Sequence, residues 1–226
     1  MAVNSKQAGV VYVVDDDRDV REGVTNLLRS IGLDVQAFDT TDTFLEHRRN
    51  DRESCLILDV RLPGKSGLDL QCDMKAKGID IPVVFISGYP DFTIGIQAMK
   101  EGAIEFLCKP FREQALMDAV RRGLERDRER RAEEASVAGI RAKYATLTGR
   151  EREVMSKVAS GLMNKSIAAQ LGISQVTVKV HRGSVMRKLG ARSLADLVRM
   201  ADVIAKMICR DIGHKRTGAV DHYTRV

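Results

Sequence analysis

Residues 10–17, Val-Val-Tyr-Val-Val-Asp-Asp-Asp, decide the fold of the first half of this chain. Five apolar, mostly β-branched residues form a short run that is typical of a strand buried in a parallel sheet. The run leads directly into three aspartates. We therefore expect a core strand at residues 10–14 with an acidic loop at its carboxyl end.

Four further apolar runs follow, separated by longer amphipathic stretches. The expected strands are residues 35–38, 56–58, 83–87 and 104–107, and the expected helices are 19–31, 41–48, 66–77, 93–100 and 112 onward. Strict alternation of this kind is typical of an α/β domain with a parallel sheet. It predicts a flavodoxin-like (βα)5 domain with strand order 2-1-3-4-5, in which ligands bind at the carboxyl ends of the strands.

The second half of the chain has no strand pattern. Helical periodicity covers residues 149–160, 164–171, 175–188 and 194–206, so we expect a small all-α domain of four helices. The predicted limits are 1–123 for the α/β domain, 124–146 for a charged helical linker, 147–206 for the helical domain and 207–226 for a polar tail. A dimeric coiled coil is the alternative for the linker, but the sequence lacks sustained heptads.

Charge separates the two halves. Residues 1–123 hold 16 Lys and Arg against 20 Asp and Glu, a net charge of −4, and residues 124–146 hold 6 against 5, or +1. Residues 147–226 hold 15 against 6, a net charge of +9. A strongly basic small domain indicates a polyanionic partner, most simply nucleic acid. A membrane surface is the alternative, but the cations are spread over several segments that share no large apolar face.

Composition narrows the classes further. The chain of 226 residues is 44% hydrophobic with 4 prolines, which excludes a collagen-like or wholly disordered protein. Residues 1–9 lack the apolar core of a signal peptide, and no apolar run approaches a membrane span, so we expect a cytoplasmic protein with no membrane partner. The four cysteines have no zinc-ligand spacing, and we expect reduced, buried thiols at Cys55, Cys72, Cys108 and Cys209.

Carboxylates follow two strands that are neighbours in the expected sheet. Asp15 and Asp16 follow the first strand, and Asp59 follows the third. These side chains should converge at one edge, and carboxylates that are crowded together repel one another. A hard cation that prefers oxygen ligands relieves this repulsion. The sequence therefore predicts a Mg²⁺ site at Asp15, Asp16 and Asp59.

Two more polar groups follow the fourth and fifth strands. Ser87 ends the fourth strand, and Lys109 follows the fifth. The metal and Lys109 would neutralise a phosphoryl group whose oxygen accepts a hydrogen bond from Ser87. Asp59, between the metal ligands, is then the natural nucleophile. Each of these signals is weak alone, but their order on successive strand ends is specific.

At this point the first 123 residues resemble the receiver domain of two-component response regulators. The resemblance rests on the acidic pair and on the segments Leu-Asp-Val-Arg-Leu-Pro-Gly at 58–64, Ile-Ser-Gly at 86–88 and Cys-Lys-Pro-Phe at 108–111. It implies that Asp59 is the phosphoacceptor, and that Asp15, Asp16 and the backbone carbonyl of Arg61 help to hold Mg²⁺. It also implies that Ser87 is the switch hydroxyl and Lys109 the phosphate partner. Phe106 would be the aromatic switch residue. Simple core packing is the alternative for Phe106.

The basic half carries the spacing of a helix-turn-helix. Ala168 is small where two helices would touch, Gly172 suits a turn with positive φ, and Val178 is apolar where the second helix packs. Ser174 is placed to cap that second helix. The helix carries polar and cationic residues of the kind that bind DNA in the major groove, namely Thr177, Lys179, Arg182, Arg187 and Lys188.

Residues 147–201 resemble the LuxR-type effector domain of the NarL/FixJ family. The resemblance rests on Leu-Thr-Gly-Arg-Glu-Arg-Glu-Val at 147–154, Gly-Leu-Met-Asn-Lys-Ser-Ile-Ala at 161–168 and Val-Thr-Val-Lys-Val-His-Arg at 176–182. It implies that Lys179 and Val180 face base edges, and that phosphates or the helix itself are supported by Asn164, Lys165, Thr177, His181 and Arg182. Gly183 departs from the family, where a larger polar residue is common, so one base contact is missing.

Together these features predict a transcription regulator and not an enzyme. The resemblance implies that a sensor histidine kinase phosphorylates Asp59 and that phosphorylation promotes homodimerisation and binding to double-stranded promoter DNA. It also implies RNA polymerase as a further partner, and activation is the commoner family role. A phosphatase with an aspartyl-phosphate intermediate is disfavoured because Arg61 stands where its second aspartate would be. A constitutive DNA-binding protein with a protein-interaction receiver domain is the remaining alternative.

Overall fold

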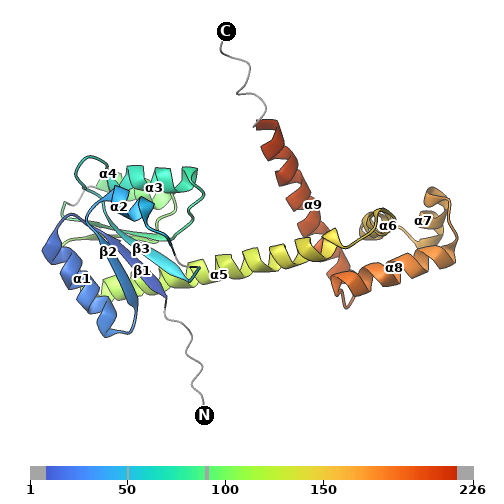
Figure 1. Cartoon of the computed structure of the whole chain (residues 1–226), viewed down its shortest axis with the longest axis horizontal. Coiled ribbons are helices and arrows are strands. Elements are labelled where there is room, and N and C mark those ends of the chain that lie inside the picture. The colour runs from blue at the N-terminus through green and yellow to red at the C-terminus, as the bar shows by residue number, and fades with distance from the viewer. Residues whose placement is uncertain (1–8, 50, 90–91, 218–226) are drawn as a thin grey trace, which may run out of the picture. The chain divides into compact units, whose positions relative to one another are not determined.

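The computed structural model describes residues 9–49, 51–89 and 92–217. The chain divides into two compact units, residues 1–132 and 133–226, which are described separately below. The division falls within a long helix, α5 (Glu113–Ala145), whose first part belongs to the front unit (Figure 1). The domain limits inferred from the sequence remain predictions.

The front unit is built on a five-stranded parallel sheet (Figure 1). Its strands are β1 (Val10–Val14), β2 (Asp34–Phe38), β3 (Ser54–Asp59), β4 (Val83–Ser87) and β5 (Glu105–Cys108), in the order β2-β1-β3-β4-β5. This confirms the predicted flavodoxin-like fold. The register pairs Val14 with Leu58 and Ser87 with Cys108, so the carboxyl ends of these strands lie along one edge.

Helices alternate with the strands. They are α1 (Arg18–Ser30), α2 (Thr41–Glu46), α3 (Gly67–Ala76), α4 (Phe92–Lys100) and α5. The side chain of Asp17 accepts from the backbone N–H groups of Asp19 and Val20, so the last of the three aspartates caps α1. Ser66 and Asp69 form a capping box at the start of α3. The caps explain why both helices begin where they do.

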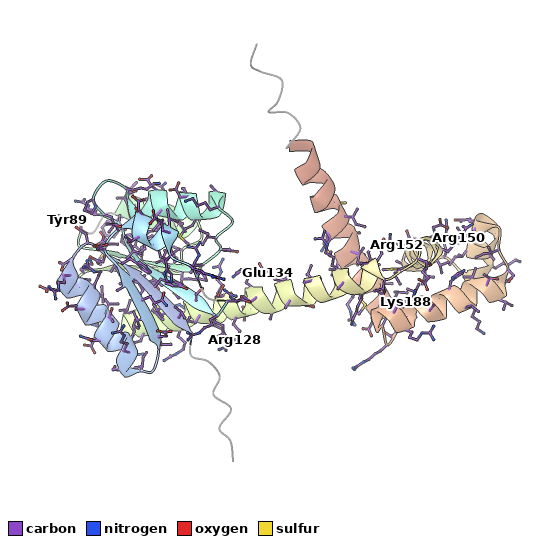
Figure 2. The ribbon with its side chains drawn as sticks, viewed as in Figure 1. Tyr89, Arg128, Glu134, Arg150, Arg152 and Lys188 are labelled. Atoms are coloured by element: carbon purple, nitrogen blue, oxygen red, sulfur yellow. The ribbon has the colours of Figure 1, made fainter. Side chains whose placement is uncertain are left out.

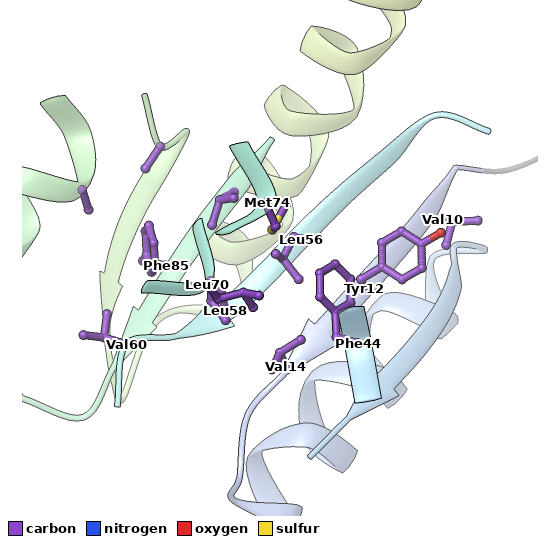
Figure 3. Close-up of a cluster of buried hydrophobic side chains, with 13 residues drawn as sticks. Val10, Tyr12, Val14, Phe44, Leu56, Leu58, Val60, Leu70, Met74 and Phe85 are labelled. Carbon is purple, nitrogen blue, oxygen red and sulfur yellow. The ribbon is translucent and has the colours of Figure 1, made fainter. Parts of the chain in front are cut away.

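The sheet is covered on both faces, which explains why its central strands are apolar throughout. One face packs against α2, α3 and α4, and its largest buried side chains include Tyr12, Phe44 and Phe85 (Figure 3). The rings of Tyr12 and Phe44 meet edge to face with centroids 5.6 Å apart. The other face packs against α1 and α5 through side chains such as Leu28 and Val120.

The segment of α5 after Gly123 is bound to the front unit, although its charged sequence predicts a linker. Asp127 is completely buried, and its carboxylate accepts hydrogen bonds from the backbone N–H of Ser54 at 2.9 Å and from the Ser54 hydroxyl at 3.3 Å. Arg130 and Arg131 form ion pairs with the same carboxylate at 2.6 and 2.7 Å. We call these residues the Asp127 clamp. It ties α5 to the start of β3.

Two neighbouring contacts support the clamp. A Cβ atom at Gly123 would collide with the Cys55 sulfur, so α5 can lie this close to β3 only with a glycine there. Arg128, labelled in Figure 2, binds the Glu53 carboxylate at 2.8 Å. Burial raises the pKa of the Cys55 thiol to about 12. The expectation of buried thiols is right for Cys55 but wrong for the other three cysteines, which are exposed on α3, at the end of β5 and on the last helix.

The rear unit is all-α, as predicted. Its helices are α6 (Gly149–Ala159), α7 (Asn164–Leu171), α8 (Gln175–Leu189) and α9 (Leu194–Thr217). Gly172 ends α7 at φ +65°, where glycine is favoured, and the turn leads into α8. The core contains the predicted Val178 of α8 together with Ile167 and Leu197.

The predicted helix 194–206 ends too early. Helix α9 runs to Thr217, eleven residues beyond the predicted end at residue 206. The rest of the predicted tail, 218–226, lies outside the described residues. Within the part of the chain that the structure describes, no helix is long and apolar enough to cross a membrane.

The clamp generates a stability prediction. Changing Asp127 to Ala should destabilise the front unit by about 3–5 kcal/mol, because the buried N–H of Ser54 loses its acceptor, and Arg130 and Arg131 lose their buried partner. The ion pairs of these arginines with the exposed carboxylates of Asp80 and Asp51 remain. The measurement is urea unfolding of the full chain followed by circular dichroism. Glu125→Ala is the control, since this exposed partner of Arg128 should contribute less than about 1 kcal/mol. Equal losses of unfolding free energy in the two variants would show that the Asp127 clamp stabilises the front unit no more than an exposed ion pair does.

Candidate functional site

The polar residues predicted at the carboxyl edge of the sheet do meet there. Asp15 follows β1, Asp59 ends β3, Ser87 ends β4 and Lys109 follows β5. The strand order places β1, β3, β4 and β5 side by side, so these four side chains come from adjacent strand ends. The peptide bond between Lys109 and Pro110 is cis.

Lys109 joins the two buried carboxylates. Its Nζ atom donates to Oδ2 of Asp15 at 2.6 Å and to Oδ2 of Asp59 at 2.5 Å. Burial raises the pKa of Asp15 above its usual value, and this outweighs the opposing effect of the Lys109 hydrogen bond. Burial alone would lower the pKa of Lys109, but the hydrogen bonds to Asp15 and Asp59 prevail and raise it. The lysine is therefore held as an ammonium ion between them.

Backbone groups fix the other oxygens of the same two carboxylates. The N–H of Asp17 donates to Oδ1 of Asp15, and the N–H of Arg61 donates to Oδ1 of Asp59, both at 2.9 Å. Asp16 is exposed beside them, and the carboxylates of Asp15, Asp16 and Asp59 offer oxygen atoms that all lie within 4.8 Å of one another. Three hard oxygen donors this close fit a Mg²⁺ ion. The part expected of the Arg61 carbonyl stays a prediction.

Ser87 is buried, and its hydroxyl is engaged locally. Its Oγ atom donates to the backbone carbonyl of Tyr89 at 3.0 Å and accepts from the Tyr89 N–H at 3.3 Å. The Arg61 guanidinium lies over the Tyr89 ring, 4.1 Å from its centroid. Sequence reasoning missed this stacked pair, although both residues stand two positions after a site residue. Tyr89 is exposed and labelled in Figure 2.

Phe106 lies on β5 and is half-buried against α4. Its ring lies against Gly95 of α4 and borders an open pocket of about 640 Å³ that is also lined by Phe92, Ile96 and Met99. Phe92 is 84% exposed, so this α4–β5 surface is strongly apolar and open. The position fits both interpretations of Phe106, because the ring contacts the core and also borders the surface.

The seven predicted DNA contacts lie on α7 and α8. Ser174 caps α8 by accepting from the Thr177 N–H at 3.0 Å, as the sequence suggested. Lys179 and Val180 are exposed one helical turn further along. Four of the other predicted contacts are partly buried, namely Asn164, Thr177, His181 and Arg182. Lys165 is exposed. The burial pattern is compatible with outward roles for Lys179 and Val180, and the DNA contacts themselves stay predictions.

Lys188 has an internal partner, which corrects its assignment to the DNA-facing cations. Its Nζ atom binds the Glu151 carboxylate of α6 at 2.7 Å (Figure 2 labels Lys188). Glu151 also accepts from the Ser184 hydroxyl and the Thr148 N–H, both at 2.7 Å. The hydrogen bond from Lys188 is the main cause that lowers the pKa of Glu151 to about 2. This Glu151 lock fixes α8 against α6.

Comparison with known proteins supports the family assigned to each half of the chain. The family model of the response regulator receiver domain matches residues 11–121, and that of the luxR family of bacterial regulatory proteins matches residues 145–201. Nodulation protein W of Bradyrhizobium diazoefficiens is 50% identical over 195 residues, covering 86% of each chain. The chain belongs to the two-component response regulators that combine a receiver domain with a LuxR-type DNA-binding domain.

Solved structures support the same assignment. The structure of the response regulator StyR is 51% identical and covers 86% of this chain and 98% of its own, with a TM-score of 0.77. Full-length FixJ from B. japonicum is 37% identical and covers 88% of this chain and 98% of its own, with a TM-score of 0.54. The family consists of transcriptional response regulators and not of enzymes.

The Glu151 lock generates a pH prediction. A lowered pKa means that the ionised carboxylate stabilises the folded rear unit fully above its ordinary pKa of about 4.5, and that this contribution is lost as the pH falls toward about 2. Glu151→Gln should therefore cost about 1–3 kcal/mol at pH 7 and progressively less below pH 4.5. The measurement compares thermal unfolding of the wild type and the variant at pH 7 and at a pH below 4.5. A difference independent of pH would contradict the ionic part of the lock.

Proposed function

We propose that Asp59 is the phosphoacceptor of this response regulator. The observation that carries the proposal is the placement of the Lys109 ammonium between Asp15 and Asp59, at the sheet edge that also holds Ser87. Such a site has a nucleophilic carboxylate, a fixed counter-charge and a hydroxyl donor within one cluster. These are the groups that phosphoryl transfer to an aspartate requires.

The chain's own residues prepare Asp59 for the transfer. The Arg61 N–H and the Lys109 ammonium hold one oxygen each, which orients the carboxylate. A carboxylate oxygen attacks the phosphorus of a phosphohistidine on a sensor kinase; the new O–P bond forms as the P–N bond breaks, and the histidine leaves. Asp15, Asp16, Asp59 and the Arg61 carbonyl would hold Mg²⁺. When bound, this ion neutralises charge on the phosphoryl oxygens.

The phosphoryl group then changes the partners of Ser87 and Lys109. It adds a charge of roughly −1.5 to −2, which attracts the ammonium and offers the Ser87 hydroxyl a stronger acceptor than the Tyr89 carbonyl. Ser87 moving toward the phosphoryl pulls the start of the β4–α4 loop with it. Phe106 acts as the aromatic switch residue beside α4, and the apolar α4–β5 surface serves homodimerisation.

The rear unit delivers the response to DNA. Helix α8 enters the major groove of promoter DNA, where Lys179 and Val180 face base edges. Phosphates are held, or the helix is supported, by Asn164, Lys165, Thr177, His181 and Arg182. A homodimer places two such helices on paired half-sites, which raises affinity because both domains bind together. The protein acts in the cytoplasm, with its sensor kinase upstream and RNA polymerase as the partner at the promoter.

Labelling tests the phosphoacceptor. Asp59→Asn should abolish incorporation of phosphate from radiolabelled acetyl phosphate in the presence of Mg²⁺, because an amide is not a nucleophile of this kind. Asp118→Asn, at an exposed position of α5, is the matched control and should label like the wild type. Unchanged labelling of the Asp59 variant would remove this residue from its role.

Base readout tests the DNA interface. Lys179→Ala should lose about 1–3 kcal/mol of binding to a duplex selected from a random library, and its base preference should relax. Lys206→Ala removes an equal charge from α9 and should keep the preference. Affinity is measured by fluorescence anisotropy on the selected and on an unrelated duplex. An equal loss on both duplexes would instead make Lys179 a phosphate contact.

A further inference from the structure

Helix α8 presents one continuous stripe to solvent. The exposed residues of the stripe recur at helical spacing along one face, with Gln175 exposed at its edge, and they are Val176, Lys179, Val180, Gly183 and Arg187. The opposite face is buried through Val178, Val185 and Leu189. The Glu151 lock and the core therefore fix which side of α8 can meet DNA. We expect the residues that read bases to come from this stripe.

The amino-terminal half of the stripe contains two exposed apolar side chains. Val176 is 73% exposed and Val180 is 65% exposed, one helical turn apart. Exposed valines that occur singly need no explanation, but these two form a pair on the face that carries Lys179. Both are β-branched and stiff, so each presents two methyl groups in a fixed direction. The pair is a small apolar surface beside a cation.

The backbone that carries Val176 is held rigidly. Val176 lies in the first turn of α8, directly after the cap that joins Ser174 to the Thr177 N–H. In helix-turn-helix proteins the residues at the start of the second helix contact the base edges. The cap therefore places Val176, which sequence reasoning did not single out, among the residues closest to the bases.

The middle of the stripe allows a close approach. Gly183 lies one turn beyond Val180, and a Cβ atom added there would meet no atom of the described residues within 4 Å. The packing of the rear unit thus does not require this glycine. Without a side chain at this position, the helix can approach the groove more closely, which short side chains such as valine need in order to reach the bases.

The chemistry identifies the ligand group. Valine neither donates nor accepts hydrogen bonds, so it cannot read the polar edges of guanine, cytosine or adenine. Thymine alone presents an apolar group in the major groove, its C5-methyl group. We propose that Val176 is a specificity-determining residue that contacts a thymine methyl group as a pair with Val180. This inference rests on the proposed function, because it requires α8 to lie in the major groove.

The experiment combines a change in the protein with a change in the base. A duplex is selected from a random library with the full-length protein and acetyl phosphate, and each thymine in turn is replaced by deoxyuridine, which lacks only the methyl group. Wild-type binding should weaken about threefold to fivefold at one thymine in each half-site, the loss expected for one buried methyl group. Val176→Ala should bind the thymine duplex more weakly and show no further loss at that position.

Met163→Ala is the matched control. Met163 is an equally exposed apolar residue, 77% exposed, and it lies outside α8. This variant should keep the full response to deoxyuridine. The proposal is overturned if no thymine responds in the wild type, or if Val176→Ala responds as strongly as the wild type. Failure of the proposed function looks different, because the wild-type protein would then bind the selected duplex no better than a scrambled one.

Gly183→Ala tests the close approach by itself. Alanine favours a helix over glycine, and the site has room for it, so the variant should unfold at a higher temperature. It should nevertheless bind the selected duplex more weakly, because the added methyl group holds α8 away from the groove. A more stable variant with unchanged affinity would show that α8 does not approach closely at Gly183 and would remove this support.

Discussion

The site of the front unit depends on one lysine between two carboxylates. Asp15 is buried and has a raised pKa, so its ionised form is costly without a counter-charge, and Lys109 supplies one to Asp15 and Asp59 together. The contact requires the ends of β1, β3 and β5 to lie at one edge, which the parallel strand order provides. A phosphoryl group on Asp59 would compete for the same ammonium. The proposed switch is therefore a redistribution of hydrogen bonds that already exist, with Ser87 exchanging the Tyr89 carbonyl for a phosphoryl oxygen.

The rear unit uses an ionic contact for a different purpose. The Glu151 lock holds α8 against α6 and turns the stripe of Val176, Lys179 and Val180 outward. One cation of α8, Lys188, therefore serves the fold, while Lys179 remains exposed. Some cations of the rear unit form internal ion pairs, and others are exposed to solvent. Net charge alone therefore indicates a nucleic-acid partner but does not show which residues contact it.

Much of this architecture can be predicted from the sequence, because its signals are local. Buried parallel strands are continuous apolar runs, and Asp15, Asp59, Ser87 and Lys109 follow such runs directly, so the strand order alone brings them together. The features that were missed depend on contacts between distant segments. Asp127 lies in a charged run and looks like its neighbours until Ser54, far away in the sequence, is seen to donate to it. The Glu151 lock and the stacking of Arg61 on Tyr89 are invisible for the same reason. The continuation of α9 beyond residue 206 was missed because the polar residues and the glycine that follow are typical of the end of a helix.

The central claim is that phosphorylation at the carboxyl edge of the sheet changes how tightly the basic unit binds DNA. The most direct measurement is the affinity of the full-length protein for its selected duplex, with and without acetyl phosphate and Mg²⁺, together with its self-association under the same conditions. The account predicts that the phosphorylated protein dimerises and binds roughly tenfold or more tightly, since two linked domains bind as one. Identical affinity and identical self-association in the two states would contradict it.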